Sequence, residues 1–187
     1  MYYGAIKKND ISNGEGIRTS LFVSGCRNKC KNCFNPETWN FTYGKPFTDE
    51  TIAEILAALK PSYIAGLSLL GGEPFEPENQ AALVKLTSAV RETYPNKTIW
   101  CYSGFRFSDQ LYAGKVGDPE TALALLRNLD VLVDGTFKEE LKDPSLLFRG
   151  SSNQNIIDVQ KSLSAGEMVL LEGKWKRTMG SGDINDL

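Results

Sequence analysis

The sequence predicts one α/β domain built as an open, partial (β/α) barrel, shorter than a full (β/α)8 barrel. Strand-like and helix-like segments alternate along the chain, which favours a parallel sheet with right-handed helical crossovers and helices over its outer face. The chain has 187 residues, whereas eight such units typically need about 250. Four motifs rich in glycine, cysteine or acidic residues follow four of the predicted strands, as ligand-binding loops do in sheets of this kind.

The predicted strands are alternating or continuous apolar runs. In the first of them Thr19, Leu21 and Val23 share one face with a period of two. Most of the later runs end at glycine or another turn residue, which marks where each strand stops. The predicted strands cover residues 18–24, 64–70, 98–102, 131–133 and 156–159.

Three helices are predicted between these strands. Residues 48–59 carry apolar side chains at helical spacing, and Thr48 is a suitable N-cap. Residues 83–90 repeat this spacing in a second helix. A third helix begins at Asp118 and Pro119, a capping residue followed by a proline at the first helical position.

The composition excludes several classes of function. Lysine and arginine number 21 against 23 aspartates and glutamates, so the net charge of -2 gives no electrostatic case for nucleic acid or an anionic membrane. No apolar run approaches the roughly 18 residues of a membrane span. The chain has no histidine, which excludes Ser-His-Asp triads, imidazole acid–base catalysis and histidine-ligated metals. The N-terminus lacks the layout of a secretory signal, and the clustered cysteines favour a reducing, cytoplasmic location.

Three of the four cysteines form the motif Cys26-x3-Cys30-x2-Cys33 in a loop of small and polar residues. These spacings allow three thiolates to face one centre, as iron–sulfur clusters require. A 4Fe-4S cluster held by three cysteines has one iron without a protein ligand, and an open position favours catalysis over a structural role. Two alternatives stay open: structural zinc bound by these cysteines and Cys101, and three reduced, unligated thiols. Cys101 lies in an apolar strand, where free cysteine usually serves as a small buried hydrophobe.

A cysteine motif directly after one strand, with Gly-Gly-Glu-Pro after the next, resembles the radical S-adenosylmethionine superfamily. Five motifs, at residues 13–26, 33–39, 100–105, 130–137 and 148–154, extend this resemblance over nearly all of residues 1–159. On these motifs the chain resembles, within the superfamily, the family of anaerobic ribonucleoside-triphosphate reductase-activating proteins. Two positions depart from the family pattern, because Asn28 stands where relatives commonly carry histidine and Asn32 where close relatives often carry glycine.

This resemblance implies a barrel of the radical S-adenosylmethionine type, with a core domain over residues 1–160. A C-terminal extension, residues 161–187, is expected to be partly disordered. The implied function is to activate anaerobic ribonucleoside-triphosphate reductase by generating its glycyl radical. The cofactors are a 4Fe-4S cluster and S-adenosyl-L-methionine, which is reductively cleaved to a 5'-deoxyadenosyl radical.

The implied partners are the reductase, as protein substrate, and an electron donor such as a flavodoxin or another low-potential reductant. No side chain is implied to be catalytic, because the cluster and the cofactor carry the chemistry. Two other functions stay open. One is the same radical chemistry on another glycyl-radical enzyme or a small molecule, and the other is a non-enzymatic zinc-binding module.

The resemblance also implies the site residues. Cys26, Cys30 and Cys33 bind the cluster. Glycines 71 and 72 let the backbone approach the methionine moiety, and the glutamate after them accepts a hydrogen bond from its amine. The structural alternatives are an ordinary strand-to-helix turn at residues 71–74 and a turn cap at Asp134. The predicted cofactor-binding residues are Asn32, Cys33, Phe34, Gly71, Gly72, Glu73, Ser103 and Asp134.

Overall fold

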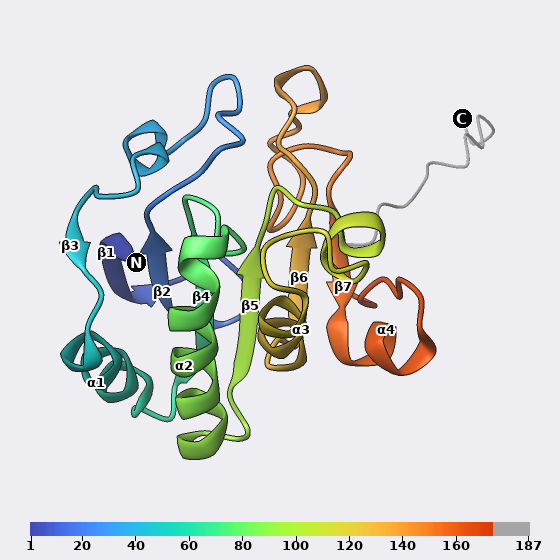
Figure 1. Ribbon diagram of the computed structural model, residues 1–187. Helices are drawn as coiled ribbons and strands as arrows, with labels where there is room; N and C mark the ends of the chain where they lie inside the picture. Colours follow the sequence, from blue (N-terminus) through green and yellow to red (C-terminus); the bar gives the residue numbers. More distant parts are fainter. Residues whose placement is uncertain (174–187) are drawn as a thin grey trace, which may run out of the picture.

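The computed structural model describes residues 1–173, which form an open seven-stranded sheet covered by helices (Figure 1). Its strands are β1 (Tyr2–Asp10), β2 (Ile17–Val23), β3 (Lys45–Pro46), β4 (Ile64–Gly71), β5 (Thr98–Tyr102), β6 (Val131–Asp134) and β7 (Asn155–Asp158). They are arranged in the order β3-β1-β2-β4-β5-β6-β7. The four central strands β2, β4, β5 and β6 are parallel. β1, β3 and β7 run antiparallel to their neighbours.

The helical elements connect these strands. The α-helices are α1 (Asp49–Leu59), α2 (Pro77–Thr93), α3 (Pro119–Arg127) and α4 (Val159–Ala165). Shorter turns are η1 (Pro36–Trp39), η2 (Phe107–Leu111) and η3 (Glu139–Leu141). α1, α2 and α3 lie over one face of the sheet (Figure 1). Among the described residues, no helix combines the length and the apolar character that crossing a membrane requires.

The main core lies between the sheet and the helices. Leu67 and Leu69 of β4, with Ile99 and Cys101 of β5, are completely buried in it. Burying one such aliphatic side chain contributes about 1.5–3 kcal/mol, so this layer dominates the stability of the fold. The intervening residues face the opposite side of the sheet, where a smaller cluster contains Trp100, Val131, Val133 and Ile156.

The predicted strands and helices are confirmed, with most observed ends within one residue of the prediction. Asp118 caps α3, because its carboxylate accepts the backbone N–H of Thr121 at 2.8 Å, and Pro119 is the first helical residue. α1 begins after Thr48, whose backbone N–H donates to Thr51 Oγ1 at 3.2 Å. The prediction of a mixed α/β fold with an open sheet is therefore correct.

The prediction of a wholly parallel sheet is wrong at both edges. β1 is absent from the predicted strands, and it pairs antiparallel with β2 across a turn in which Gly14 and Gly16 have φ angles of 114° and 78°. At the other edge, η3 is the only helical element described between β6 and β7. A parallel partner requires a long crossover, usually helical, whereas an antiparallel partner requires only a loop. The turn between β1 and β2 is too short for a crossover, and the longer β6–β7 connection has no crossover α-helix, so both edges of the sheet are antiparallel.

The boundary expected at residue 160 falls within α4, which runs from Val159 to Ala165. Residues 174–187, where disorder was expected, lie outside the described residues.

A buried arginine ties the central strands together. Arg18 is completely buried, and its guanidinium donates to Ser68 Oγ at 2.7 Å and to the carbonyl oxygens of Leu67 and Thr98, each at 2.8 Å. Burial lowers its pKa to about 10. The guanidinium also lies 5.5 Å from the centre of the Trp100 ring. These bonds join β2, β4 and β5 through one side chain.

The tight approach of β4 to β5 predicts that Gly66→Ala destabilises the fold. A Cβ at Gly66 would lie 1.8 Å from the carbonyl oxygen of Thr98, which is backbone and cannot move without shifting β5. We expect the free energy of unfolding to fall by about 1–3 kcal/mol in a denaturant titration. Gly4→Ala in β1 is the matched control, because its Cβ would meet the side chain of Tyr43, which can move. Equal losses in the two variants would contradict the explanation.

Candidate functional site

The loops that follow the central parallel strands lie together at the carboxyl ends of these strands (Figure 1). β2 leads into the cysteine motif, β4 into Gly72 and Glu73, β5 into Ser103 and β6 into Gly135. The convergence expected for a parallel sheet therefore holds for these four segments.

The cysteine loop begins with backbone contacts that fix its first residues. The N–H of Gly25 donates to the carbonyl of Thr38 at 2.7 Å, and that of Cys26 to the carbonyl of Trp39 at 3.3 Å. The carbonyl of Gly25 accepts the N–H of Glu73 at 2.8 Å, which extends the pairing of β2 with β4 past the strand ends. As a result, Cys26 is buried, with 8% of its surface exposed.

Arg27 attaches the next part of the loop to α2. Its backbone N–H donates to Glu76 Oε1 at 2.7 Å, and its guanidinium forms ion pairs with Glu76 and Glu78. The guanidinium also lies 4.4 Å from the centre of the Phe41 ring. Glu76 is almost completely buried, so its contacts with Arg27 neutralise a carboxylate that is costly to bury alone.

Backbone groups face the sulfur atoms of all three loop cysteines. The N–H of Asn35 donates to Cys33 Sγ at 3.4 Å. Hydrogen bonds from the backbone of Asn28 favour the thiolate of Cys26, and one from Phe137 favours that of Cys30. Such amide donors stabilise anionic sulfur and are typical around iron–sulfur clusters.

Burial acts in the opposite direction on these thiols. It raises the pKa of Cys26 to about 11. Burial is also the main reason that the pKa of Cys30 is raised, and the neighbouring Cys33 adds to this effect. A thiolate at these positions therefore requires a positive centre beside it. Among residues 1–173, no group of three His, Cys, Asp or Glu side chains is arranged to hold a metal. The donor set, three soft sulfurs in one loop with backbone amides beside them, fits an iron–sulfur cluster rather than a hard cation.

The structure does not bring Cys101 to the cysteine loop. Cys101 is completely buried in β5, in the core on the helical side of the sheet. Burial raises its pKa well above the usual range. The interpretation of Cys101 as a buried hydrophobe is confirmed, and the four-cysteine zinc site has no support in this arrangement.

Glu73 is the centre of a buried hydrogen-bond network, and only 1% of its surface is exposed. Its Oε1 accepts the backbone N–H of Phe75 at 2.9 Å and the hydroxyl of Ser103 at 2.8 Å. Its Oε2 accepts the backbone N–H of Gly104 at 2.7 Å and the side-chain amide of Asn28 at 3.2 Å. Burial raises the pKa of Glu73 to about 7, although the hydrogen bonds from Phe75, Gly104 and Ser103 act to lower it.

Two glycines allow the loops to approach each other. Gly71 has a φ of 106°, and a Cβ there would lie 2.8 Å from the backbone of Phe22. A Cβ at Gly72 would lie 2.6 Å from the carbonyl oxygen of Gly25. The packing of β2 against Gly71 and of the cysteine loop against Gly72 therefore needs glycine at both positions, whether or not a ligand is present.

Asp134 connects loops rather than capping the turn at Gly135. Its Oδ2 accepts the backbone N–H of Phe107 at 2.8 Å, and its Oδ1 accepts the side-chain amide of Asn155 at 2.9 Å. Asp134 is buried, with 2% exposed. These bonds position the segment after β5 and the start of β7.

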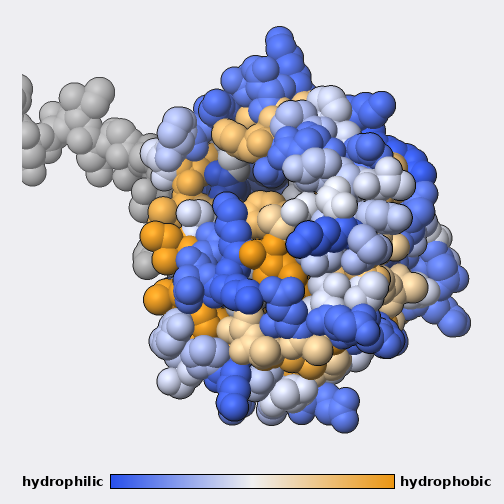
Figure 2. All heavy atoms as spheres, turned by 90° about the vertical axis from the view of Figure 1, so that its left-hand side faces the viewer, coloured by the Kyte–Doolittle hydropathy of each residue, from blue (hydrophilic) through white to orange (hydrophobic). Residues whose placement is uncertain are grey.

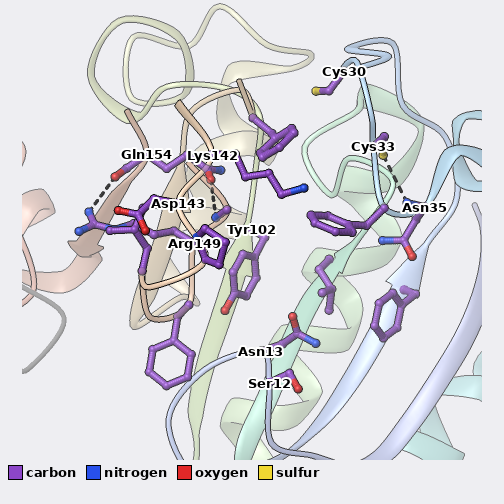
Figure 3. Close-up of a pocket in the computed structure, with 18 of the residues that line it drawn as sticks. Ser12, Asn13, Cys30, Cys33, Asn35, Tyr102, Lys142, Asp143, Arg149 and Gln154 are labelled. Atoms are coloured by element: carbon purple, nitrogen blue, oxygen red, sulfur yellow. Dashed lines mark hydrogen bonds between the residues drawn. The ribbon is translucent and has the colours of Figure 1, made fainter. Parts of the chain in front are cut away.

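A pocket of about 680 Å³ opens on the face of the sheet opposite the main helices. Its floor includes Phe22, Leu70 and Tyr102 from three central strands. Figure 3 shows Cys30 and Cys33 on one side of the pocket, and residues of the β6–β7 loop on the other. The lining residues of that loop include Lys142, Asp143, Arg149 and Gln154.

The pocket contains only two of the predicted cofactor-binding residues, Cys33 and Phe34. Phe34 is largely exposed at 73%, and Lys142 Nζ lies 5.5 Å from the centre of its ring. On the side of the molecule where the β3–β1 edge lies, patches of apolar surface stand among hydrophilic residues (Figure 2). The other predicted residues do not line the pocket, namely Asn32, Gly71, Gly72, Glu73, Ser103 and Asp134.

Sequence reasoning missed the contributions of β1 and of the turn after it. Lys7, Ser12 and Asn13 line the pocket, and Lys7 Nζ lies 4.8 Å from the centre of the Phe22 ring. The glycine-containing turn after β1 is the local signal for a hairpin here, because β1 itself lacks a clean alternation of buried and exposed residues. Arg149 stands in one of the five motifs, but no spacing rule connects it to the cysteines.

Comparisons with known proteins agree with the motifs. A family described as a 4Fe-4S single cluster domain matches residues 12–157. A protein of Pasteurella multocida named anaerobic ribonucleoside-triphosphate reductase-activating protein is 40% identical over 158 residues, which are 83% of this chain and 96% of the relative. Proteins of the same name from Enterobacteria phage T4 and Escherichia coli K12 are 38% and 42% identical. These alignments cover 83% and 78% of this chain, and 93% and 90% of the relatives.

The raised pKa of Glu73 predicts a pH dependence of stability in the metal-free protein. Between the ordinary glutamate pKa of 4.5 and about 7, the folded state keeps a proton that the unfolded state releases. The contribution of this group therefore stabilises the fold at low pH and is lost as the pH rises through this window, by up to about 3 kcal/mol. Denaturant titrations of the wild type and of Glu73→Gln at several pH values measure this term as their difference. A difference that does not vary between pH 4.5 and 7 would show that Glu73 titrates normally.

Proposed function

The chain belongs to the family of anaerobic ribonucleoside-triphosphate reductase-activating proteins, and we propose that it generates the glycyl radical of that reductase. The observation that carries this proposal is the loop of three cysteines whose sulfur atoms face backbone amides beside an open pocket. When bound, a reduced 4Fe-4S cluster and S-adenosylmethionine supply the radical chemistry that removes a hydrogen atom from a glycine. A mechanism of this kind needs no imidazole, in agreement with a chain that has no histidine.

In this proposal, Cys26, Cys30 and Cys33 hold the cluster. Cys26 is fixed by backbone bonds, whereas Cys30 and Cys33 are half-buried and line the pocket. The loop turns between them through Asn32, which has a φ of 57°. Asparagine adopts this left-handed conformation more readily than most residues, which suits it to the turn.

We assign the cofactor S-adenosylmethionine to the side of the pocket next to these cysteines. Phe34 and Cys33 would contact it directly, since both line the pocket. Gly71, Gly72 and Glu73 would shape the nearby backbone, and the carboxylate of Glu73 is the acceptor proposed for the amine, which would take the place of one of the four donors that this carboxylate has here. Ser103 would orient Glu73 through their 2.8 Å hydrogen bond. Asp134 and Asn32 complete the proposed set.

The remaining walls suit a reaction that must exclude water. Phe22, Leu70 and Phe137 present apolar side chains to the pocket, while Lys142 and Arg149 provide positive charge on the far side. A large protein substrate can cover the open side of such a pocket and hold a glycine near the reacting centre. We also propose that the sheet is an open partial barrel of the radical S-adenosylmethionine type, with its core over residues 1–160 and an extension over residues 161–187.

The proposal includes an electron donor and a cellular location. The donor is a flavodoxin or another low-potential reductant, because the cluster must be reduced before each reaction. All four cysteines are free thiols in the structure, and three of them are proposed metal ligands. Such a set requires a reducing compartment, so we propose a cytoplasmic enzyme.

The decisive test is electron paramagnetic resonance of an anaerobic mixture with the reductase. The iron-loaded protein, the reductase, S-adenosylmethionine and a low-potential reductant should together give a glycyl radical signal. Omitting S-adenosylmethionine should abolish the signal. If methionine accumulates at the same rate without the reductase and no radical forms, the target is a different molecule.

Iron analysis tests the ligand assignment. Each of the three variants with alanine at Cys26, Cys30 or Cys33 should have its iron content lowered from about four per chain to near zero. The two thiolates that remain hold a 4Fe-4S cluster poorly. Cys101→Ala is the matched control and should retain the iron, since Cys101 lies in the core. Loss of iron in Cys101→Ala, with a folded protein by circular dichroism, would show that the assignment is wrong.

A further inference from the structure

The middle of the cysteine loop is attached to the sheet through the side chain of Asn28. Of the four groups that donate to Glu73, those of Phe75, Ser103 and Gly104 belong to segments that follow β4 and β5. Only the amide of Asn28, at 3.2 Å from Oε2, comes from the cysteine loop. The contact therefore links two parts of the chain that are 45 residues apart.

The residue after Ser103 has space for this contact only because it is glycine. A Cβ on Gly104 would lie 2.2 Å from Asn28 Nδ2 and 3.4 Å from Glu73 Oε2. The backbone N–H of Gly104 also donates to the same carboxylate oxygen. Asn28, Glu73 and Gly104 thus form one packed contact, in which the side-chain amide lies directly over the backbone of the β5 loop.

Asn28 also lies between an anchored residue of the loop and a sharp turn. Arg27 before it is attached to α2, and Lys29 after it has a φ of 44°, so the chain turns sharply there before reaching Cys30. Cys30 and Cys33 follow within five residues and line the pocket. Among the contacts described for residues 27–29, that of Asn28 is the one that reaches the Glu73 network.

We propose that Asn28 is a positioning residue, which holds the cysteine loop at a set distance from the Glu73 carboxylate and so defines the binding site for S-adenosylmethionine. This inference rests on the proposed function. The side-chain amide of Asn28 offers the N–H donor that this contact requires, and a histidine at this position would also offer one.

The test uses variants of the same size or the same donor capacity. Asn28→Asp keeps the shape of the side chain but removes the donor and places a second carboxylate against Glu73. Loss of this hydrogen bond, together with the second carboxylate beside Glu73, should raise the Kd for S-adenosylmethionine about tenfold. Asn28→His retains a donor and should stay within about twofold of wild type. Asn96→Asp, in the exposed turn before β5, controls for the change in net charge.

The affinity is measured on the iron-loaded protein by equilibrium dialysis, and the iron content is measured on the same samples. A double-mutant cycle with Glu73→Gln identifies the partner. If Asn28 acts through Glu73, adding Asn28→Asp to Glu73→Gln should change the Kd less than twofold. An equal tenfold effect in both backgrounds, or no effect in either, would overturn the proposal.

A second measurement does not depend on cofactors. In the metal-free protein, Asn28→Asp should accelerate tryptic cleavage after Lys29 and Lys31, because the loop loses its attachment to the sheet. The same substitution in the Glu73→Gln background should have little further effect. If wild type binds neither iron nor S-adenosylmethionine, the proposed function fails while the cleavage rates still decide the contact. Unchanged cleavage in Asn28→Asp would overturn the role of Asn28.

Discussion

The buried carboxylate of Glu73 is the constraint on which the arrangement of the site depends. It accepts hydrogen bonds from the segments after β4 and β5 and from the cysteine loop, so three of the converging segments share one acceptor. Such a buried group is costly unless every oxygen has donors, and here each oxygen has two. The close packing of Gly71, Gly72 and Gly104 follows from this arrangement, because side chains there would separate the segments that Glu73 joins.

The central part of the fold could be predicted from the sequence because local patterns and tertiary packing agree there. The strands β4 and β5 are short apolar runs between helices, two of which, α1 and α3, begin at recognisable caps. A parallel sheet needs such helical crossovers. The edges could not be predicted in the same way. β1 alternates buried and exposed residues irregularly, with register shifts in its pairing to β2, so its sequence lacks a clean period of two.

The candidate site also has one part that could be predicted from the sequence and another that could not. The cysteines and the Gly-Gly-Glu motif were found because their spacing or their position after a strand has a chemical meaning. The far wall of the pocket, including Lys142 and Arg149, belongs to a long connection without regular periodicity. Its place opposite Cys33 depends on how β7 pairs with β6, which is a tertiary property. The partner of Asn28 was equally beyond sequence reasoning, since nothing near it in the chain points to Glu73.

The anchoring of the cysteine loop has a consequence for how the holoprotein matures. Cys26 is held by Trp39 through the backbone, and its neighbours Gly25 and Arg27 are held by Thr38 and Glu76. All these contacts are made by the polypeptide, whereas small zinc-dependent domains fold only when the metal arrives. We therefore expect folding to come first and metallation second, with the assembly machinery delivering iron and sulfide to a finished scaffold. If folding precedes metallation, loss of the cluster to oxygen would leave a folded chain that can bind a new cluster.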